Sequence, residues 1–577
     1  MPETVECISS GLQAQNAFSA AKATGSSFNL EAIVVDSTKR EARAAGAPAA
    51  AKQGLVYELD SCSTIKRGQK DNQSDVYPPA LRTTASNPDP PSVNTLTLEA
   101  ISYTNRALIL NFGTLFFMLQ YLTHTSVQFY PRHVWERSIR NVSKEVRKFS
   151  IGVAFVFHDY VLAFPTLDLL FQPTWAASFS DFSIPPNIYT STNDFLSLVA
   201  TWIDGILRTP VHTRACDTIR GLNTLFYGVG VYTVMELFFM AGLSPFLTLY
   251  EVFSNPSRAA RFLLAFYSYI ARAERDLWKT IVQSAIHDGI LAPTTDQRLR
   301  YGDWLYIWAK DKTLMPLRMA CLVDEYHAKL DELSCAEAAW SQDAENQLFD
   351  VFEPTFLALG FQSPLSLGHL IFGADDWVQL GGTPCSHEDP ITAVYRKHGL
   401  LGSPTRLKFD PSESLILPHE QFRGKRSSYR PTRPAAARSV QGAEHHECLF
   451  KNIVATTLGV SIGPLEYCGV GHIVHVGPAP YVAVCKGDPA ISEYHEKRAL
   501  RGLDRISAHL ETAGKRKRAR SLKENKQLAK KLSKLDAGYH RVGAGAVEDA
   551  EGTEPQPSKP KKRRLSADQR LALATIN

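Results

Sequence analysis

The clearest chemistry in this sequence belongs to two clusters of cations near its C-terminal end. The first basic block, Lys515–Lys534, contains ten Lys and Arg and one Glu, and the second, Lys559–Ser566, places five basic residues around Pro560. Closely spaced cations in an extended chain bind the acidic pockets of nuclear-import receptors. We therefore predict that an import receptor recognises both blocks. The predicted import residues are Lys515, Arg516, Lys517, Arg518, Arg520, Lys559, Lys561, Lys562, Arg563 and Arg564.

The positive charge of the chain is concentrated in this tail. Residues 515 to 577 contain 17 Lys and Arg against 7 Asp and Glu, whereas the whole chain has a net charge of only +5. Residues 1 to 514 are therefore slightly acidic. A localised positive segment of this kind indicates a polyanionic partner and not a generally basic surface.

The first basic block also fits nucleic-acid binding, because a helix formed there would present a continuous positive surface to phosphates. It contains no aromatic residue, so it offers no stacking on bases. DNA or RNA contact without sequence preference is the prediction, with import alone or a protein-binding amphipathic helix as alternatives. The predicted contact residues are Lys523, Lys526, Lys530, Lys531 and Lys534.

Ser566 follows the pair Arg563–Arg564 by two residues, a spacing that basophilic kinases favour. A phosphate there would add about −1.5 to −2 charges beside the second basic block and would pair with its arginines. The sequence thus predicts a phosphorylation site at Ser566 that weakens import. An unmodified serine in the tail is the alternative.

One set of residues has the types that zinc prefers. Cys448, Cys468, His472 and His446 could supply four sulfur or nitrogen ligands. Their spacing is irregular and lacks the short Cys-x2-Cys knuckle, so ordinary half-buried Cys and His fit it better. We expect no cofactor, with zinc as the one candidate metal.

Two short motifs resemble catalytic signatures without their context. Gly459–Gly463 has the Gly-x-Ser-x-Gly pattern of hydrolases, but Pro464 follows where the required helix should begin. Asp375 and Asp376 resemble a paired-aspartate magnesium site, but the further acidic motifs of a polymerase are missing, and acids at a helix terminus fit better. Neither motif indicates an enzyme.

Composition indicates a large folded intracellular protein. Of the 577 residues 44% are hydrophobic, and nine cysteines are scattered along the chain. The apolar stretch Ala107–Pro131 has no Asp, Glu, Lys or Arg, yet it contains polar side chains such as Asn111 and His124. We expect buried helices there and no membrane span.

Periodicity predicts a mainly α fold. Apolar residues recur at three- and four-residue steps between Phe195 and Ile206 and again between Phe262 and Ala273, with Asn193 or Asp194 as the cap of the earlier helix. Short Val- and Ile-rich runs broken by Gly and Pro predict a small β module near the C-terminal end. The expected organisation is a disordered arm at 1–94, a mainly helical domain at 95–382, a basic Pro-containing linker at 383–442, the β module at 443–490, a basic amphipathic helix at 491–535 and a disordered tail at 536–577.

These features together predict a non-enzymatic nuclear protein whose tail mediates import and contacts nucleic acid nonspecifically. A viral coat or nucleoprotein-like assembly subunit is the first alternative, because a basic tail can neutralise a packaged genome. An enzyme with an unrecognised site is the second alternative. The residues point to no specific family.

Overall fold

The structure of the chain is a computed structural model. All described residues lie within the compact unit Met1–Leu503. The residues that the structure describes are 3–38, 40–41, 56–59, 65–69, 71–78, 93–121, 125–140, 149–166, 169–222, 224–243, 245, 247–287, 289–291, 295–308, 313–316, 319, 325, 328, 352–382, 388–401, 426–429, 463–465, 473–476 and 479–482.

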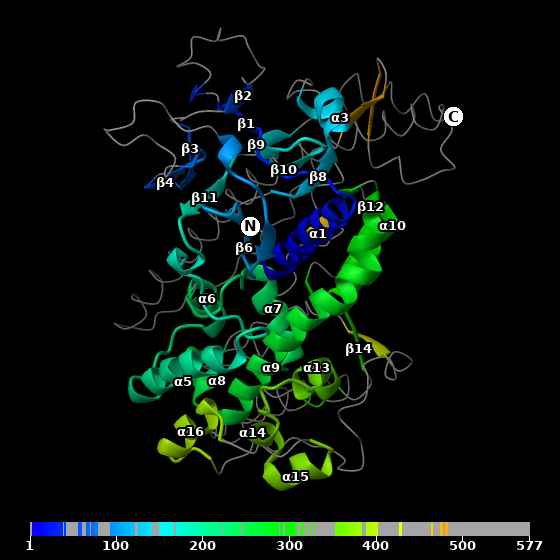
Figure 1. The fold of residues 1–577 in the computed structure, drawn as a ribbon. Helices are drawn as coiled ribbons and strands as arrows, with labels where there is room; N and C mark the ends of the chain where they lie inside the picture. The colour runs from blue at the N-terminus through cyan, green and yellow to red at the C-terminus, as the bar shows by residue number, and fades with distance from the viewer. Residues whose placement is uncertain are drawn as a thin grey trace, which may run out of the picture. The chain divides into compact units, whose positions relative to one another are not determined.

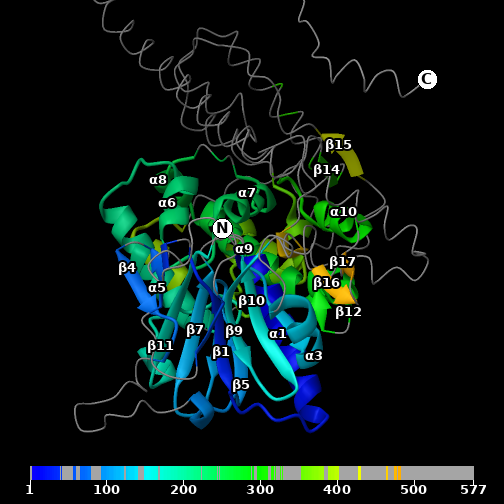
Figure 2. The same ribbon diagram turned by 90° about the horizontal axis from the view of Figure 1, so that it is seen from above.

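The first half of the chain contains two antiparallel sheets and a long helix, α1 (Thr4–Ala23). The five-stranded sheet has the order β2-β1-β9-β10-β8 and the four-stranded sheet the order β11-β7-β6-β5. Figure 2 shows these strands beside α1. Their bounds are Ala32–Asp36 (β1), Val56–Leu59 (β2), Ala100–Tyr103 (β5), Ala107–Asn111 (β6), Phe116–Tyr121 (β7), Gln128–Pro131 (β8), Ser150–Val156 (β9), Tyr160–Thr166 (β10) and Phe171–Ala176 (β11).

The two sheets share one hydrophobic core. The rings of Phe117 on β7 and Phe155 on β9 meet edge to face at 5.0 Å, and Trp175 on β11 packs on Phe117 at 4.8 Å. Every residue of β9 is buried. Alternate residues of this strand face the other sheet and a second core formed with α1 and the later helices. The five-stranded sheet is therefore covered on both faces.

The second half is helical. The helix α9 (Pro256–Arg272) begins with a side-chain cap, because the Asn255 carboxamide oxygen accepts the backbone N–H of Arg258 at 3.1 Å. It continues as the π-helical segment η5 (Ala273–Val282), and Figure 1 shows it among the other helices. The remaining helices are α5 (Thr192–Arg208), α6 (Ala215–Gly221), α7 (Val231–Met240), α8 (Leu249–Phe253), α10 (Thr295–Trp304), α13 (Ala358–Phe361), α14 (His369–Phe372), α15 (Ala374–Gln379) and α16 (Pro390–Lys397), with the short α3 (Arg132–Trp135) and the π-helical η3 (Glu136–Arg140) between strands β8 and β9.

Short elements complete the described part of the chain. Four two-stranded antiparallel ladders and several single turns of 3-10 helix are present. The ladders are β3 (Lys66–Gln69) with β4 (Asn72–Asp75), β12 (Ile286–His287) with β13 (Ile290–Leu291), β14 (Thr313–Pro316) with β15 (Arg426–Tyr429), and β16 (Ile473–Val476) with β17 (Ala479–Val482). The 3-10 turns are η2 (Val93–Thr95), η4 (Phe179–Asp181), η6 (Gln283–Ala285), η7 (Pro354–Leu357) and η9 (Gly463–Leu465).

The prediction of a mainly α fold is wrong, because the chain is a mixed α and β protein. The apolar stretch from Ala107 to Pro131, which we expected to be helical, forms β6, β7 and β8. The strands β6 and β8 are buried on both faces and show no polar alternation, so their sequence resembles that of a buried helix. No described helix has the length and apolar character needed to cross a membrane.

The expected disordered arm is also wrong, since α1 and β1 lie within it. Likewise α16 forms inside the segment that we expected to be a linker. The helices predicted around Phe195 and Phe262 are confirmed as α5 and α9, although Ser191, and not Asn193 or Asp194, is the N-cap residue of α5. Within the residues predicted to form the β module, Ile473–Val476 and Ala479–Val482 form the two-stranded ladder of β16 and β17, Gly463–Leu465 forms the turn η9, and the others lie outside the described residues.

Candidate acid–base site at Glu3

Glu3 is a carboxylate whose environment differs strongly from that of an ordinary surface carboxylate. It is the N-cap residue of α1, and its own backbone N–H donates to Glu6 Oε2 at 2.9 Å in a capping box. Its side chain is only 6% exposed. A glutamate at the start of the chain is thus held inside the protein.

The first turn of α7 binds the Glu3 carboxylate through three backbone N–H groups. Glu3 Oε2 accepts from Gly230 at 3.1 Å and from Thr233 at 2.8 Å, and Glu3 Oε1 accepts from Tyr232 at 3.3 Å. These donors belong to the N-terminal end of a helix, where N–H groups have no intrahelical partner and favour an anion. Glu3 therefore occupies the anion position of α7.

Glycine at position 230 makes this close approach possible. A Cβ built on Gly230 would lie 2.2 Å from both the Cδ and the Oε1 of Glu3. Two residues earlier, Gly228 has a φ of +87°, and its carbonyl oxygen accepts the backbone N–H of Thr4 at 3.1 Å. The two glycines bring the first turn of α1 and the first turn of α7 together.

Burial raises the pKa of the Glu3 carboxyl from 4.5 to about 7, although the N–H donors at Thr233 and Val231 oppose the shift. Loss of hydration thus outweighs the stabilisation of the anion by α7. The carboxyl changes charge near neutral pH, which is the range in which a general acid or base works best. Val231, which lies between Gly230 and Tyr232 in sequence, is 40% exposed, so the Glu3 site lies close to the protein surface.

Two further carboxylates lie near this position. The first is Glu6, whose Oε2 accepts a hydrogen bond from the Tyr232 hydroxyl group. Glu236, fully buried on α7, accepts three successive backbone N–H groups, from Tyr306 at 2.7 Å, Ile307 at 2.8 Å and Trp308 at 2.7 Å. Glu236 therefore fixes the chain after α10 and has a structural role.

Two buried phenols lie within electrostatic range of the same carboxylates. Burial raises the pKa of Tyr269 and of Tyr301 well above the ordinary value, and the nearby charges of Glu236 and Glu6 add to the effect. Neither hydroxyl has a hydrogen-bond partner among the described residues. Both phenols therefore stay protonated at neutral pH.

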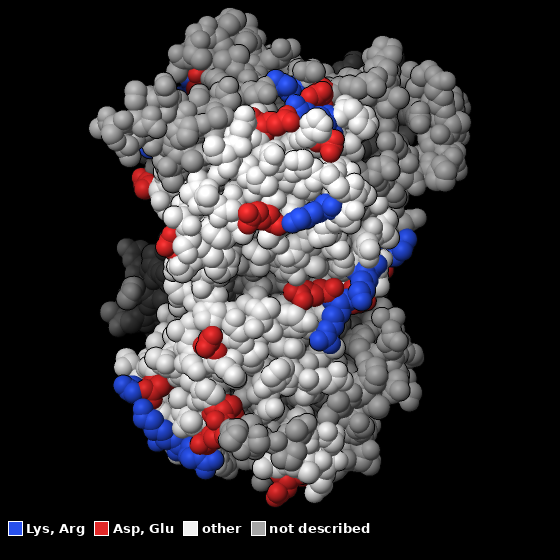
Figure 3. Space-filling view, in the orientation of Figure 1, with Lys and Arg blue, Asp and Glu red and all other residues white. Residues whose placement is uncertain are grey.

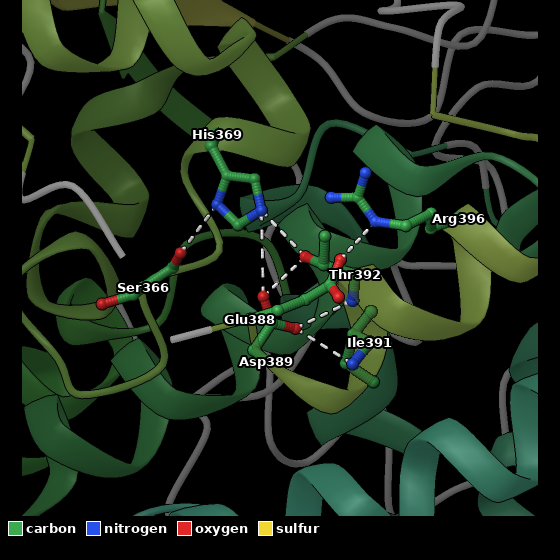
Figure 4. A network of polar contacts seen from close by, with 7 residues as sticks. All are labelled: Ser366, His369, Glu388, Asp389, Ile391, Thr392 and Arg396. Carbon is green, nitrogen blue, oxygen red and sulfur yellow. Dashed lines mark hydrogen bonds and ion pairs between the residues drawn. The ribbon is translucent and has the colours of Figure 1, made fainter. Parts of the chain in front are cut away.

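A second polar network joins α14 to α16 (Figure 4). His369 Nδ1 donates to the Ser366 carbonyl oxygen at 3.0 Å, and Nε2 lies 2.8 Å from the Thr392 hydroxyl, which also contacts Asp389 Oδ2 at 2.5 Å. The other Asp389 oxygen accepts the backbone N–H groups of Ile391 and Thr392. Because Thr392 is buried and Asp389 caps the helix, this network resembles a catalytic triad only in residue type.

The structure describes few of the residues singled out in the sequence. Asp375 and Asp376 are confirmed as exposed acids in the first turn of α15. The zinc candidates Cys448, Cys468, His472 and His446 lie outside the described residues, as do Ser461 of the hydrolase-like motif, Ser566 and both basic blocks. Among the described residues no group of His, Cys, Asp and Glu could hold a metal ion.

Sequence reasoning missed Glu3 altogether. A signal was present, since Glu3 and Glu6 have the spacing of a capping box and indicate a helix start. Nothing local indicates burial, because the groups that bury Glu3 come from residues 230 to 233.

Comparison with known proteins leaves the family open. No family model and no curated protein sequence matches the chain. Among solved structures it is similar to the Lactococcus lactis formamidopyrimidine DNA glycosylase Fpg, or MutM, bound to DNA containing an abasic site, with 14% identity and a TM-score of 0.25. The match covers 32% of this chain and 65% of that one, which is less than two thirds of the glycosylase.

Two further solved structures of this group give similar values. MutM in complex with DNA containing carbocyclic 8-oxo-G has 12% identity, a TM-score of 0.25 and coverage of 31% of this chain and 64% of that one. The Lactococcus lactis enzyme with DNA containing N7-benzyl-Fapy-dG has 12% identity, a TM-score of 0.28 and coverage of 38% and 78%. These TM-scores are too low to establish a common fold, so the similarity assigns neither a fold nor a function to this chain.

Proposed function

We propose that this protein is a nuclear nucleic-acid-binding enzyme in which Glu3 transfers a proton during bond cleavage. The observation that carries the proposal is the buried Glu3 carboxyl, whose pKa burial raises to about 7. Carboxyls tuned to this range serve as general acids or bases, and strongly shifted groups gather at functional sites. This proposal replaces the expectation of a non-enzymatic protein.

The nucleic-acid part of the proposal rests on the charge of the tail. On the face shown in Figure 3, basic and acidic side chains of the described residues are interspersed, with no large field of one sign. The excess of cations lies in the two basic blocks instead. Phosphate binding by this tail would raise the local concentration of substrate at the folded part.

The reaction class follows from the group available. A carboxyl that is half protonated near neutral pH can protonate a leaving base while water adds at the sugar carbon, or it can withdraw a sugar proton while the neighbouring phosphate leaves and a double bond forms. Each step breaks a bond of the nucleotide. The substrates to test are duplex oligonucleotides with an abasic site or an oxidised base, the kinds of DNA bound in the solved structures compared above, with an undamaged duplex of the same sequence as control.

The decisive variant is Glu3→Gln, which keeps the shape of the protonated acid but cannot transfer the proton. We expect the wild type to cleave at least one of the damaged duplexes and the variant to be slower by a factor of about 10² to 10⁴. Glu99→Gln, at an exposed position, is the matched control and should retain full activity. Equal rates for Glu3→Gln and the wild type, or no cleavage of any substrate by the wild type, would overturn the enzymatic proposal.

Binding is tested separately by deleting residues 515 to 535. The affinity of the full chain for an undamaged duplex should fall with salt at a slope of about −0.9 in log K per phosphate contacted, and the deletion should remove most of that slope. An unchanged affinity after deletion would place the binding surface in another part of the chain.

Nuclear import is tested with a fluorescent fusion. Replacing Lys561, Lys562, Arg563 and Arg564 with alanine should weaken nuclear accumulation, and removal of the first block as well should abolish it. Phosphorylation of Ser566 in vitro should slow import relative to Ser566→Ala. Nuclear concentration of a fusion that lacks both blocks would refute the import role.

A further inference from the structure

We propose that Tyr232 is the positioning residue of the Glu3 site and that it acts through Glu6. This inference deepens the proposed function and rests on it for the role of Glu3 in catalysis. The contacts that carry it are independent of that role.

Tyr232 touches the first turn of α1 twice. Its backbone N–H donates to Glu3 Oε1 at 3.3 Å, and its side-chain hydroxyl donates to Glu6 Oε2. The same oxygen of Glu6 accepts the backbone N–H of Glu3 at 2.9 Å. The three residues therefore form a closed ring of hydrogen bonds between the first turns of α1 and α7.

The phenol is the one member of this ring that can be removed without disturbing the others directly. The ring of Tyr232 packs against Trp308, with centroids 6.1 Å apart, so phenylalanine can keep the same packing. Its backbone N–H still points at Glu3 in such a variant. Only the donor to Glu6 is lost.

Loss of that donor should lower the pKa of Glu3 through the packing of α1. The phenol holds Glu6, which in turn accepts the backbone N–H of Glu3, so without the phenol the first turn of α1 is held less tightly and water reaches the Glu3 carboxyl more readily. Burial is the largest cause of the raised pKa of Glu3, so better hydration favours its ionised form.

The experiment measures the ionisation midpoint of Glu3 in the full chain without relying on catalysis. The pH dependence of unfolding is recorded for the wild type and Glu3→Gln, and again for Tyr232→Phe and the Tyr232→Phe/Glu3→Gln double variant. The difference within each pair isolates the Glu3 proton. We expect Tyr232→Phe to lower the midpoint by about one pH unit, a tenfold loss of proton affinity.

Tyr395→Phe is the matched control for a merely structural tyrosine. Its buried hydroxyl donates to the Phe253 carbonyl oxygen at 2.8 Å, so the variant loses one hydrogen bond as Tyr232→Phe does. It should lower stability and leave the Glu3 midpoint where it is. An unchanged midpoint in Tyr232→Phe would overturn the proposal.

A double-variant cycle tests the route through Glu6. Glu6→Gln should lower the Glu3 midpoint too, and Tyr232→Phe should add little in the Glu6→Gln background, because both substitutions weaken the same link between α7 and the first turn of α1. Strictly additive shifts would refute action through Glu6. If the wild type cleaves a damaged duplex, its pH profile should shift with the midpoint, whereas an inactive wild type would refute the proposed enzyme and leave the midpoint test valid.

Discussion

Replacing Glu3 with Gln should remove a large part of the pH dependence of stability in this protein. Burial raises the pKa of Glu3 from 4.5 to about 7, so the folded state holds this proton more tightly than the unfolded state does. The resulting stabilisation is complete below the unfolded value and is lost as the pH rises through the folded value. The wild type should thus be less stable in mild base than in mild acid.

The magnitude follows from the two pKa values. In the interval between them the wild type should lose about 1.4 kcal/mol of unfolding free energy per pH unit through this group. Between about pH 5 and about pH 8 the loss sums to roughly 2.5 kcal/mol. Glutamine has no proton to release, so the variant should lack this component.

Urea unfolding followed by tryptophan fluorescence at closely spaced pH values measures the effect. The quantity to plot is the difference in unfolding free energy between the wild type and Glu3→Gln, since other ionisable groups contribute equally to both. Glu99→Gln, an exposed control, should run parallel to the wild type. Parallel curves for the wild type and Glu3→Gln would mean that Glu3 titrates as an ordinary surface glutamate, and the acid–base site would be refuted.

Three further variants test hydrogen bonds and close contacts at Glu236, at Gly230 and at the start of α9. Glu236→Ala leaves the N–H groups of Tyr306, Ile307 and Trp308 without their acceptor, so it should lower the unfolding free energy by about 3 kcal/mol or more, and Glu236→Gln should cost less. Gly230→Ala places a methyl group against the Glu3 carboxyl, so it should lower the unfolding free energy by about 1–3 kcal/mol and abolish the pH dependence of stability that Glu3 contributes. Gly205→Ala, in open space on α5, should be neutral or stabilising. Asn255→Ala removes the α9 cap and should lower the unfolding free energy by about 1 kcal/mol in the same urea assay. An unchanged urea midpoint in any of these three variants would contradict the role given to that residue.

One of the two helices that the sequence predicted, α5, has one face exposed to water. On α5, Phe195, Val199, Ile203 and Ile206 are buried while the residues between them include exposed ones. This produces the three- and four-residue repeat from which the helix was predicted. Amphipathic elements at the surface can be predicted because apolar residues face the core and polar residues face water, and this order repeats along the sequence.

The elements that were missed have no such repeat in their sequence. Half of the residues of α1 are buried and they are distributed around the helix, since it contacts the sheets on one side and η5 on another. Because no apolar stripe marks this helix, α1 was included in the expected disordered arm. The strands β6 and β8 are nearly all buried, so they gave an unbroken apolar run instead of an alternation.

The Glu3 site could not be predicted for a related reason. The capping box of Glu3 and Glu6 is local and readable, but it indicates only where α1 begins. The property that matters is burial, and this comes from Gly230 and its neighbours more than 200 residues away in sequence. A carboxylate in a polar segment has an ordinary pKa until the fold removes its water.

Two opposing effects set the charge of Glu3. Their balance depends on the contact between the first turns of α1 and α7, which we call the seam. The N–H groups of α7 favour the anion, and burial disfavours it more strongly, so the carboxyl is held near its midpoint at neutral pH. A movement that opens the seam weakens both effects, and because burial is the larger of the two, the net result is a lower pKa for Glu3. Opening of the seam should therefore release the Glu3 proton, and closure should take it up again.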